Sequence, residues 1–280
     1  MFFISRLKKF PIANHVILSI LALIIILPVT ILLFNSVKPK AEIGINPLGF
    51  PHEMRFQNYS DAFVKANYAK VFFNSFILVV GTLFLCIPLS GAAAFSLAVM
   101  KSGKRITPLV GLYLLVGLSI PAQLYILPLF ILWKFLHLNN SFLGLIIIYT
   151  ALNAPFAVFL IRSYMLQLPQ ELFEAARIEG ASNIQLFIKI AVPLSWPVFL
   201  TSGLIVALAV WNEFLFAVTF IYDDSIKPIS TILFAFSDRF KNDYALISAS
   251  AVMMALPMII LFVLFQRNFI VGLTSGSMKS

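Results

Sequence analysis

The sequence predicts an all-α membrane protein with six transmembrane helices. Of its 280 residues, 61% are hydrophobic and only 11% are charged, and the mean hydropathy is +0.98. Soluble domains carry about 25% charged residues. A helix needs roughly 20 apolar residues to cross the hydrocarbon core. Six stretches are suitable: 15–34, 73–100, 106–132, 142–161, 198–221 and 244–265. None alternates like a barrel strand, so helices are predicted throughout.

The first apolar stretch is predicted to be a retained span. It follows Arg6, Lys8 and Lys9, but it is too long for a signal-peptide core and lacks a small-residue cleavage site. Cys86, the only cysteine, falls in the second stretch. An intrachain disulfide is therefore excluded, and thiol catalysis is disfavoured. No repeat or soluble appendage is visible, and we expect one domain over residues 1–280.

The net charge of +9 resides mainly beside the spans, where basic residues orient the chain. The basic residues divide 11 to 9 between the two sides. The side with more of them includes the residues before the first span and the tight Lys101–Arg105 loop, where the positive-inside rule is most reliable. Both termini and the insert 162–197 are therefore predicted to be cytoplasmic. Residues 38–70, with a short helix at Asn58–Ala66, and residues 222–243, with an amphipathic patch at Ile232–Phe240, are predicted to be outside.

Several spans contain proline, which removes a backbone donor and kinks a helix. These residues are Pro28, Pro88, Pro121, Pro128, Pro155 and Pro257. One interpretation is the ordinary composition of membrane helices, whose neighbours satisfy the freed carbonyls. The other is that Pro121 and Pro128, with Gly117, make a bent helix that lines a pathway.

The insert between the fourth and fifth spans is polar and predicts two short helices joined by a tight turn. Pro169 suits a first helical turn, and Glu171 and Glu174 suit the positive end of the helix dipole. Gly180 provides a left-handed stop. The run Ser182–Gln185 resembles a capping box that starts the second helix. That helix is predicted to end at Pro193 and to carry one apolar stripe: Ile184, Phe187, Ile188 and Ala191. Such an exposed element is suited to binding a partner protein.

No enzymatic or nucleotide-binding motif is visible. Lys101–Lys104 lacks the leading glycine and the spacing of a phosphate-binding loop. The histidines are scattered, with no metal-ligand spacing, and no nucleophile elbow or paired carboxylates occur. We therefore expect a chain that is not an enzyme and binds no metal or cofactor, so any energy for its work must come from elsewhere.

Glu213 is the one ionisable residue that lies clearly inside a span. A charge at membrane depth costs at least ~2.5 kcal/mol and marks a candidate functional site. With Trp211 and Asn212 it could bind a polyhydroxylated ligand, but the same residues also suit interhelical packing. Asn153 is a weaker candidate for the pathway. A single buried acid is too little for an ion relay, which favours a permease driven by a separate motor.

Three segments resemble one known family. Glu174-Ala175-Ala176, followed by Gly180, Ile190 and Pro193, resembles the EAA loop of binding-protein-dependent ABC importers, with Val192 in place of the usual leucine. The run Trp211–Phe214 is similar to the Trp-Asn-acid-Phe signature of the carbohydrate-importing branch. The C-terminus from Gln266 resembles the tail of MalG-type permease subunits, although Asn268 stands where tyrosine is common and Ser280 where glycine is.

The resemblance implies a type I ABC importer (MetI-like) permease fold in a bacterial inner membrane. It implies two cytoplasmic docking surfaces. The coupling helix would dock on an ATPase dimer through Glu171, Glu174, Ala175, Ala176, Arg177, Glu179, Gly180 and Ser182. The tail 266–280 would dock through Gln266, Arg267, Gly276 and Lys279. The substrate pathway or gate would involve Trp211, Asn212, Glu213 and Asn153.

The partners that the resemblance implies are a second, homologous permease subunit, the ATPase dimer, an extracytoplasmic solute-binding protein, membrane lipid and a sugar. ATP and Mg²⁺ would be bound by the ATPase, and no nucleic acid is expected. Two other functions are left open. The same machine could carry a glycerol phosphodiester or polyol, although no span interior holds an arginine for a phosphate. An ion-coupled secondary transporter would leave the polar insert unexplained.

Overall fold

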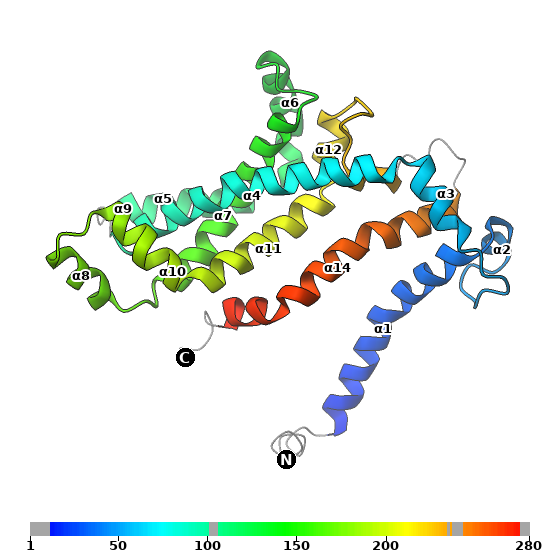
Figure 1. Ribbon diagram of the computed structural model, residues 1–280, viewed down its shortest axis with the longest axis horizontal. Coiled ribbons are helices and arrows are strands. Elements are labelled where there is room, and N and C mark those ends of the chain that lie inside the picture. Colours follow the sequence, from blue (N-terminus) through cyan, green and yellow to red (C-terminus); the bar gives the residue numbers. More distant parts are fainter. Residues whose placement is uncertain (1–11, 101–105, 234–235, 237–242, 275–280) are drawn as a thin grey trace. The chain divides into compact units, whose positions relative to one another are not determined.

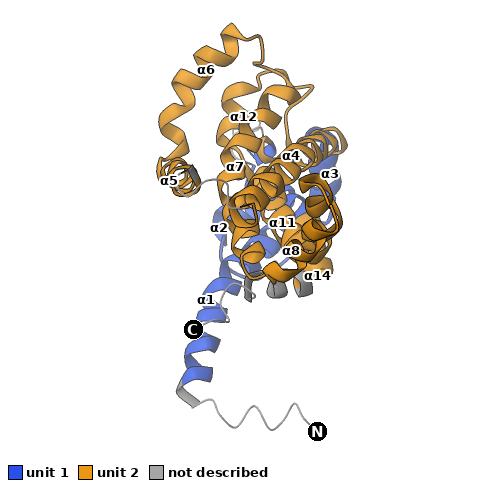
Figure 2. Ribbon diagram, turned by 90° about the vertical axis from the view of Figure 1, so that its left-hand side faces the viewer, with its two compact units in different colours: residues 1–68, 232–256 blue, residues 69–231, 257–280 orange. Residues whose placement is uncertain are grey.

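The computed structural model describes residues 12–100, 106–233, 236 and 243–274, and no strand occurs within these ranges. Figure 1 shows the helices in chain order. The chain divides into two compact units, residues 1–68 with 232–256 and residues 69–231 with 257–280 (Figure 2). The single permease domain over residues 1–280 stays a prediction.

The first unit contains α1 (Ile12–Val37), α2 (Lys40–Ile45), α3 (Gln57–Lys65) and the first part of α14 (Tyr244–Thr274). The Lys38 side chain is fully buried at the end of α1 and donates hydrogen bonds to Asn35 Oδ1, Asn46 O and Gly49 O at 2.7–3.1 Å. The buried Asn58 amide then donates to the carbonyls of Ser36 and Lys38. These bonds fasten α3, the short helix expected at 58–66, to the end of α1.

The second unit contains the helices that position the candidate site. They are α4 (Tyr68–Ala98), α5 (Ile106–Ser119), η2 (Ala122–Tyr125), α6 (Ile126–Phe135), α7 (Phe142–Met165), α8 (Gln170–Ile178), α9 (Asn183–Gln185), η3 (Leu186–Ala191), α10 (Val192–Leu194), α11 (Trp196–Asn212), α12 (Leu215–Phe220), η4 (Ile229–Thr231) and the end of α14. Helices α5 and α11 both pack on α7. A buried apolar cluster joins α4, α7 and α11 to the insert between α7 and α11.

Four of the described helices are long and apolar enough to cross a membrane, or up to six if each of two bent helix pairs is one span. Helices α1, α4, α7 and α14 correspond to the first, second, fourth and sixth predicted spans. Helix α14 continues to Thr274, so the predicted tail from residue 266 begins as helix. The Ile232–Phe240 patch lies mostly outside the described residues.

The third span is expected over 106–132. In the structure it is not one continuous helix, because the chain bends by 89° between α5 and the segment that starts at Ala122. Helix α5 ends at Ser119, and the last helical bond joins Ile120 N to Val116 O. Pro121 supplies no N–H and disfavours helical geometry at Ile120. The bend expected from Pro121 is therefore confirmed, and Pro128 fits into the first turn of α6.

The fifth predicted span, 198–221, is also interrupted. Helix α11 ends at Asn212, Glu213 adopts an extended backbone with φ −69° and ψ 121°, and α12 follows from Leu215. At its other end, α11 is bent by 79° from the segment Asn183–Leu194.

Candidate functional site

The insert between α7 and α11 folds into two helical segments, which we call the knob (residues 169–195). Pro169 directly precedes α8, and Gly180 has a φ of +85° after it. Gly180 N donates to Arg177 O, and Ala181 N donates to Ala176 O, which is the Schellman pattern of helix termination. The Ser182 hydroxyl accepts from Gln185 N while Gln185 Oε1 accepts from Ser182 N. The predicted glycine stop and capping box are both confirmed.

The knob is anchored in the apolar core of the second unit. Phe173 of α8 and Leu186 of η3 are fully buried in the same cluster as Ile161 of α7 and Phe199 of α11. The Phe95 ring of α4 lies 6.2 Å from the Phe173 ring and 5.4 Å from the Phe187 ring. A force on the knob would therefore reach α4, α7 and α11 through close contacts, since packed interiors transmit strain.

The outer surface of the knob exposes most of the predicted docking residues. Ala176 is half-buried against the core, and the others are exposed: Glu171, Glu174, Ala175, Arg177, Glu179, Gly180 and Ser182. Three apolar residues of the knob are also exposed, and the sequence pattern assigns none of them to the docking surface. Ile178, Ile184 and Ile188 are 87%, 70% and 58% exposed. Large exposed apolar side chains rimmed by polar ones mark interaction sites.

The predicted apolar stripe of the second helix is correct for two of its four residues, because Ala191 is buried in the core and Phe187 packs against it. Ile184 and Ile188 are exposed, whereas Leu186 and Ala191 are fully buried. The segment Leu186–Ala191 is π-helical, and Val192 N donates to Phe187 O, five residues earlier. Pro193 accounts for the wider turn because it has no N–H for the carbonyl four residues before it. The helix ends at Leu194, one residue beyond the predicted Pro193.

Glu213 lies at the break between α11 and α12, and its carboxylate connects this break to both α12 and α7. Its Oε1 accepts from Phe216 N at 2.8 Å, and its Oε2 accepts from Ala217 N at 3.0 Å. These amides belong to the first turn of α12, where N–H groups lack helical partners. The Tyr149 hydroxyl of α7 also donates to Oε2, at 2.8 Å. The carboxylate thus caps one helix and binds a second.

The other predicted pathway residues do not form one cluster with Glu213. Trp211 is buried, and its ring meets Phe72 of α4 edge-on at 5.4 Å. The exposed Asn212 amide donates to Leu208 O of its own helix. Asn153 likewise donates to Tyr149 O, one turn earlier on α7. Trp211 therefore packs against a neighbouring helix, and the two asparagines form hydrogen bonds within their own helices.

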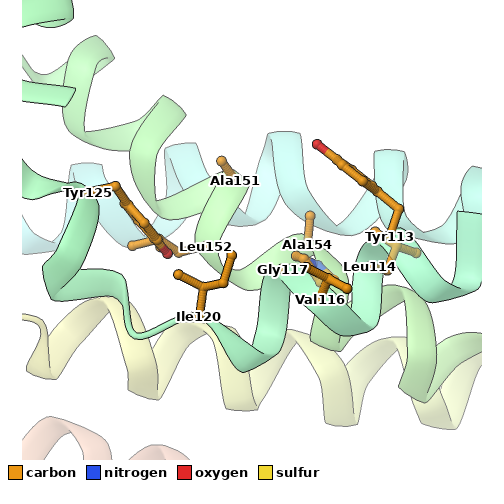
Figure 3. A pocket seen from close by; sticks show the side chains of 10 residues that line it. Tyr113, Leu114, Val116, Gly117, Ile120, Tyr125, Ala151, Leu152 and Ala154 are labelled. Carbon is orange, nitrogen blue, oxygen red and sulfur yellow. The ribbon is translucent and has the colours of Figure 1, made fainter. Parts of the chain in front are cut away.

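A cavity of about 440 Å³ lies between the bent α5–η2 segment and α7. Figure 3 shows Tyr125 and Tyr113 toward its two ends, with Gly117 and Ile120 on one side and Ala151 and Ala154 on the other. The bend at Pro121 thus borders a space large enough for a small ligand. Asn153 is not among its lining residues.

The predicted tail residues are described only in part. Gln266 is exposed near the end of α14, and the backbone of Arg267 is helical. Gly276 and Lys279 lie outside the described residues.

Residues 86–273 match the family of inner membrane components of binding-protein-dependent transport systems. The chain belongs to this family. The matched region contains both the knob, with its EAA motif, and the α11–α12 break. The protein is therefore a multi-pass ABC transporter permease of the inner membrane.

Relatives match over nearly the full chain. The diacetylchitobiose uptake permease NgcG of Streptomyces coelicolor is 32% identical and covers 97% of this chain and 90% of its own. The arabinooligosaccharide permease AraQ of Bacillus subtilis is 32% identical over 98% of each chain. A bacterial ABC transporter for import of the acidic polysaccharide alginate has a TM-score of 0.77 at 21% identity and covers 92% of this chain and 95% of its own. A second alginate transporter structure, with a pentasaccharide-bound periplasmic protein, has a TM-score of 0.65.

Proposed function

We propose that this permease imports a sugar, in particular an oligosaccharide, by alternating access driven by a separate ATPase. The observation that carries the proposal is the knob, whose surface is exposed while Phe173 and Leu186 are fully buried among three membrane helices. The relatives named for diacetylchitobiose and arabinooligosaccharides support the cargo class.

The mechanism follows from this anchoring. ATP and Mg²⁺ bind to the ATPase dimer, which closes and displaces the knob. Glu171, Glu174, Arg177 and Glu179 give the contact its register, since charges at an interface favour specificity over affinity. Ile178 and Ile184 add apolar contact area. The displacement tilts α4, α7 and α11 together, because bundles change between discrete packings and do not deform continuously.

The remaining partners occupy other surfaces. A second permease subunit completes the pathway, and a solute-binding protein docks on the segments 38–70 and 222–243 outside. In this proposal the cavity beside the Pro121 bend is part of the route, and Trp211, Asn212, Asn153 and Glu213 position the helices around it. Gln266 and the residues after it form the second ATPase contact.

The test of coupling is a charge reversal on the knob. Glu174→Lys should abolish co-purification of the ATPase subunit and reduce ATP-driven sugar uptake into proteoliposomes about tenfold or more, as loss of an interface hot spot does. Glu53→Lys makes the same change at an exposed glutamate in residues 38–70 and should retain the ATPase. Uptake that persists without ATP and follows an ion gradient would instead identify a secondary transporter.

A further inference from the structure

A second pocket lies at the far end of α6, beside the segment 222–243 assigned above to the binding protein, and no ligand has yet been assigned to it. It is an open groove of about 400 Å³ between the end of α6, the turn before α7 and the segment after α12. Its lining residues are Phe130, Lys134, His137, Asn139 and Tyr222. We call it the outer pocket, because the charge pattern places residues 133–141 and 222–243 on the extracytoplasmic side. Figure 1 shows α6 and α12 side by side, and the two helices are in contact.

The frame of the outer pocket is built from hydrogen bonds that connect the two segments. Asn140, with a φ of +56°, donates from its backbone N to Phe220 O at 2.9 Å. Its side-chain Oδ1 accepts from Tyr222 N and Asp223 N at 3.2 and 3.0 Å. On the α6 side, the buried Trp133 donates from Nε1 to Gly144 O. The lining side chains therefore project from a fixed frame.

Lys134 is the one charged side chain among the described residues that line the outer pocket, and His137 adds ring nitrogens that can form hydrogen bonds. Within the described parts of the chain, neither Lys134 nor His137 forms an ion pair. Of the two nearest acidic residues along the chain, Asp224 is in an ion pair, whereas Asp223 accepts from a backbone amide and keeps its negative charge. Asp223 Oδ1 accepts from Ser225 N at 2.8 Å, and Asp224 Oδ1 pairs with Lys227 Nζ at 2.7 Å. The pocket can therefore attract an anionic group.

The outer pocket also holds an acceptor without a donor. Asn139 Oδ1 is buried, and no donor among the described residues reaches it. The Asn139 amide nitrogen reaches Phe130 O only at 3.5 Å. Leaving a buried polar atom unpaired costs about 1–3 kcal/mol. Because Oδ1 itself is inaccessible, a ligand hydroxyl would donate to it only after the Asn139 side chain turns toward the pocket, which would remove that cost. The rings of Phe130 and Tyr222 offer apolar surface next to it.

We propose that the outer pocket binds one carboxylated sugar unit, such as a uronic acid, at the entrance to the transport route. The carboxylate accepts charge-assisted hydrogen bonds from Lys134 Nζ and the His137 imidazole. A ring hydroxyl donates to Asn139 Oδ1, and the C–H face of the sugar ring packs on an aromatic side chain. This inference rests on the proposed function for its cargo class and adds that the cargo is acidic.

The test compares two trisaccharides that differ only in their carboxylates. The permease complex with its ATPase, in nanodiscs and without the binding protein, is titrated with mannuronate trisaccharide and with neutral mannotriose, and binding is followed by saturation-transfer NMR. The acidic sugar should bind up to about fivefold more tightly, as expected for an ion pair with an exposed lysine. Lys134→Gln combined with His137→Gln should remove this preference. Lys65→Gln, at an exposed lysine on the same side outside the pocket, should preserve it.

Two results would overturn the assignment. If the two sugars bind equally, and binding is unchanged in the double variant Lys134→Gln with His137→Gln, the pocket does not recognise a carboxylate. Loss of binding-protein capture in that variant, with equal binding of both sugars, would make the pocket a docking surface for an acidic protein patch. Either result leaves the importer function standing if ATP-driven uptake of at least one of the two trisaccharides is observed and is abolished by Glu174→Lys. That function fails separately if no sugar is taken up with ATP.

Discussion

Both oxygens of the Glu213 carboxylate are occupied by hydrogen bonds, one to Phe216 N and two to Ala217 N and the Tyr149 hydroxyl. A charge inside a span is costly unless such partners are present. Three donors from two helices offset that cost and stabilise a helix that is broken at Glu213. The residue is therefore better placed to position α12 against α7 than to bind a sugar directly.

Removing the Tyr149 hydroxyl should weaken this junction without changing sugar recognition. Tyr149→Phe is expected to lower stability by about 1.5–3 kcal/mol, the usual contribution of a hydrogen bond to a charged group. The maximal uptake rate should fall with it, while KM for the sugar stays constant. Thermal unfolding of the detergent-solubilised complex and an uptake titration would measure both quantities.

Two variants separate this role from alternatives. Tyr164→Phe, on the same helix, removes a hydroxyl with no hydrogen bond to another described residue and should change little. Glu213→Ala leaves all three donors unpaired and should destabilise more, and adding Tyr149→Phe to it should then have little further effect. A several-fold rise in KM for the sugar in Tyr149→Phe would instead assign the pair to ligand binding.

At the scale of single elements, the sequence predicted local features well, but it placed only part of the buried face of the knob's second helix correctly. The glycine stop at Gly180, the capping box at Ser182 and the bend at Pro121 each depend on one to four neighbouring residues, and all three are present. The buried face of η3 depends on how a π-helical turn meets Pro193, which a 3.6-residue period cannot describe. The interruption at Glu213 depends on Tyr149, 64 residues away in the chain.

The Gly180 turn gives a prediction in which backbone conformation alone changes. A Cβ added at Gly180 would meet no atom within 4 Å, so packing is not affected. The left-handed backbone costs an alanine about 1–2 kcal/mol, whereas asparagine tolerates it. ATPase co-purification and thermal stability of the knob should therefore follow the order glycine, asparagine, alanine. Gly44→Ala, which also has open space but lies in helix α2, should not destabilise. Equal behaviour of Gly180→Ala and Gly180→Asn would contradict this account.

At the scale of the whole second unit, α4 connects the knob to the segment on the opposite side. Phe95 near one end of α4 contacts Phe173 and Phe187 of the knob. Near the other end, the Asn74 amide donates to Ser225 O and Lys227 O, and Ser75 Oγ accepts from Ile229 N at 2.8 Å. At 1.5 Å per residue these contacts are about 30 Å apart along the helix. A tilt of α4 would thus move both ends together, as alternating access requires.

A tilt of α4 can couple the ATPase to the binding protein only if the knob and the segments 38–70 and 222–243 lie on opposite sides of the membrane. The basic residues predict that orientation, with the knob inside, by a small excess. The chain's single cysteine, the buried Cys86, makes the prediction testable, because Cys86→Ser gives a cysteine-free background. Glu53 and Glu174 are both exposed glutamates and provide a matched pair of labelling sites.

In intact cells, a membrane-impermeant maleimide should label Glu53→Cys and should label Glu174→Cys only after permeabilisation, because reagent outside the cell reaches only extracytoplasmic loops. Both cysteines must react in the permeabilised sample, which controls for their accessibility. Labelling of Glu174→Cys alone from outside would show that the orientation is the reverse of the predicted one. A cytoplasmic ATPase could then not reach the knob. Labelling of both sites from outside would mean that the chain crosses the membrane an even number of times between residues 53 and 174. The predicted number of spans and the coupling route would then both be wrong.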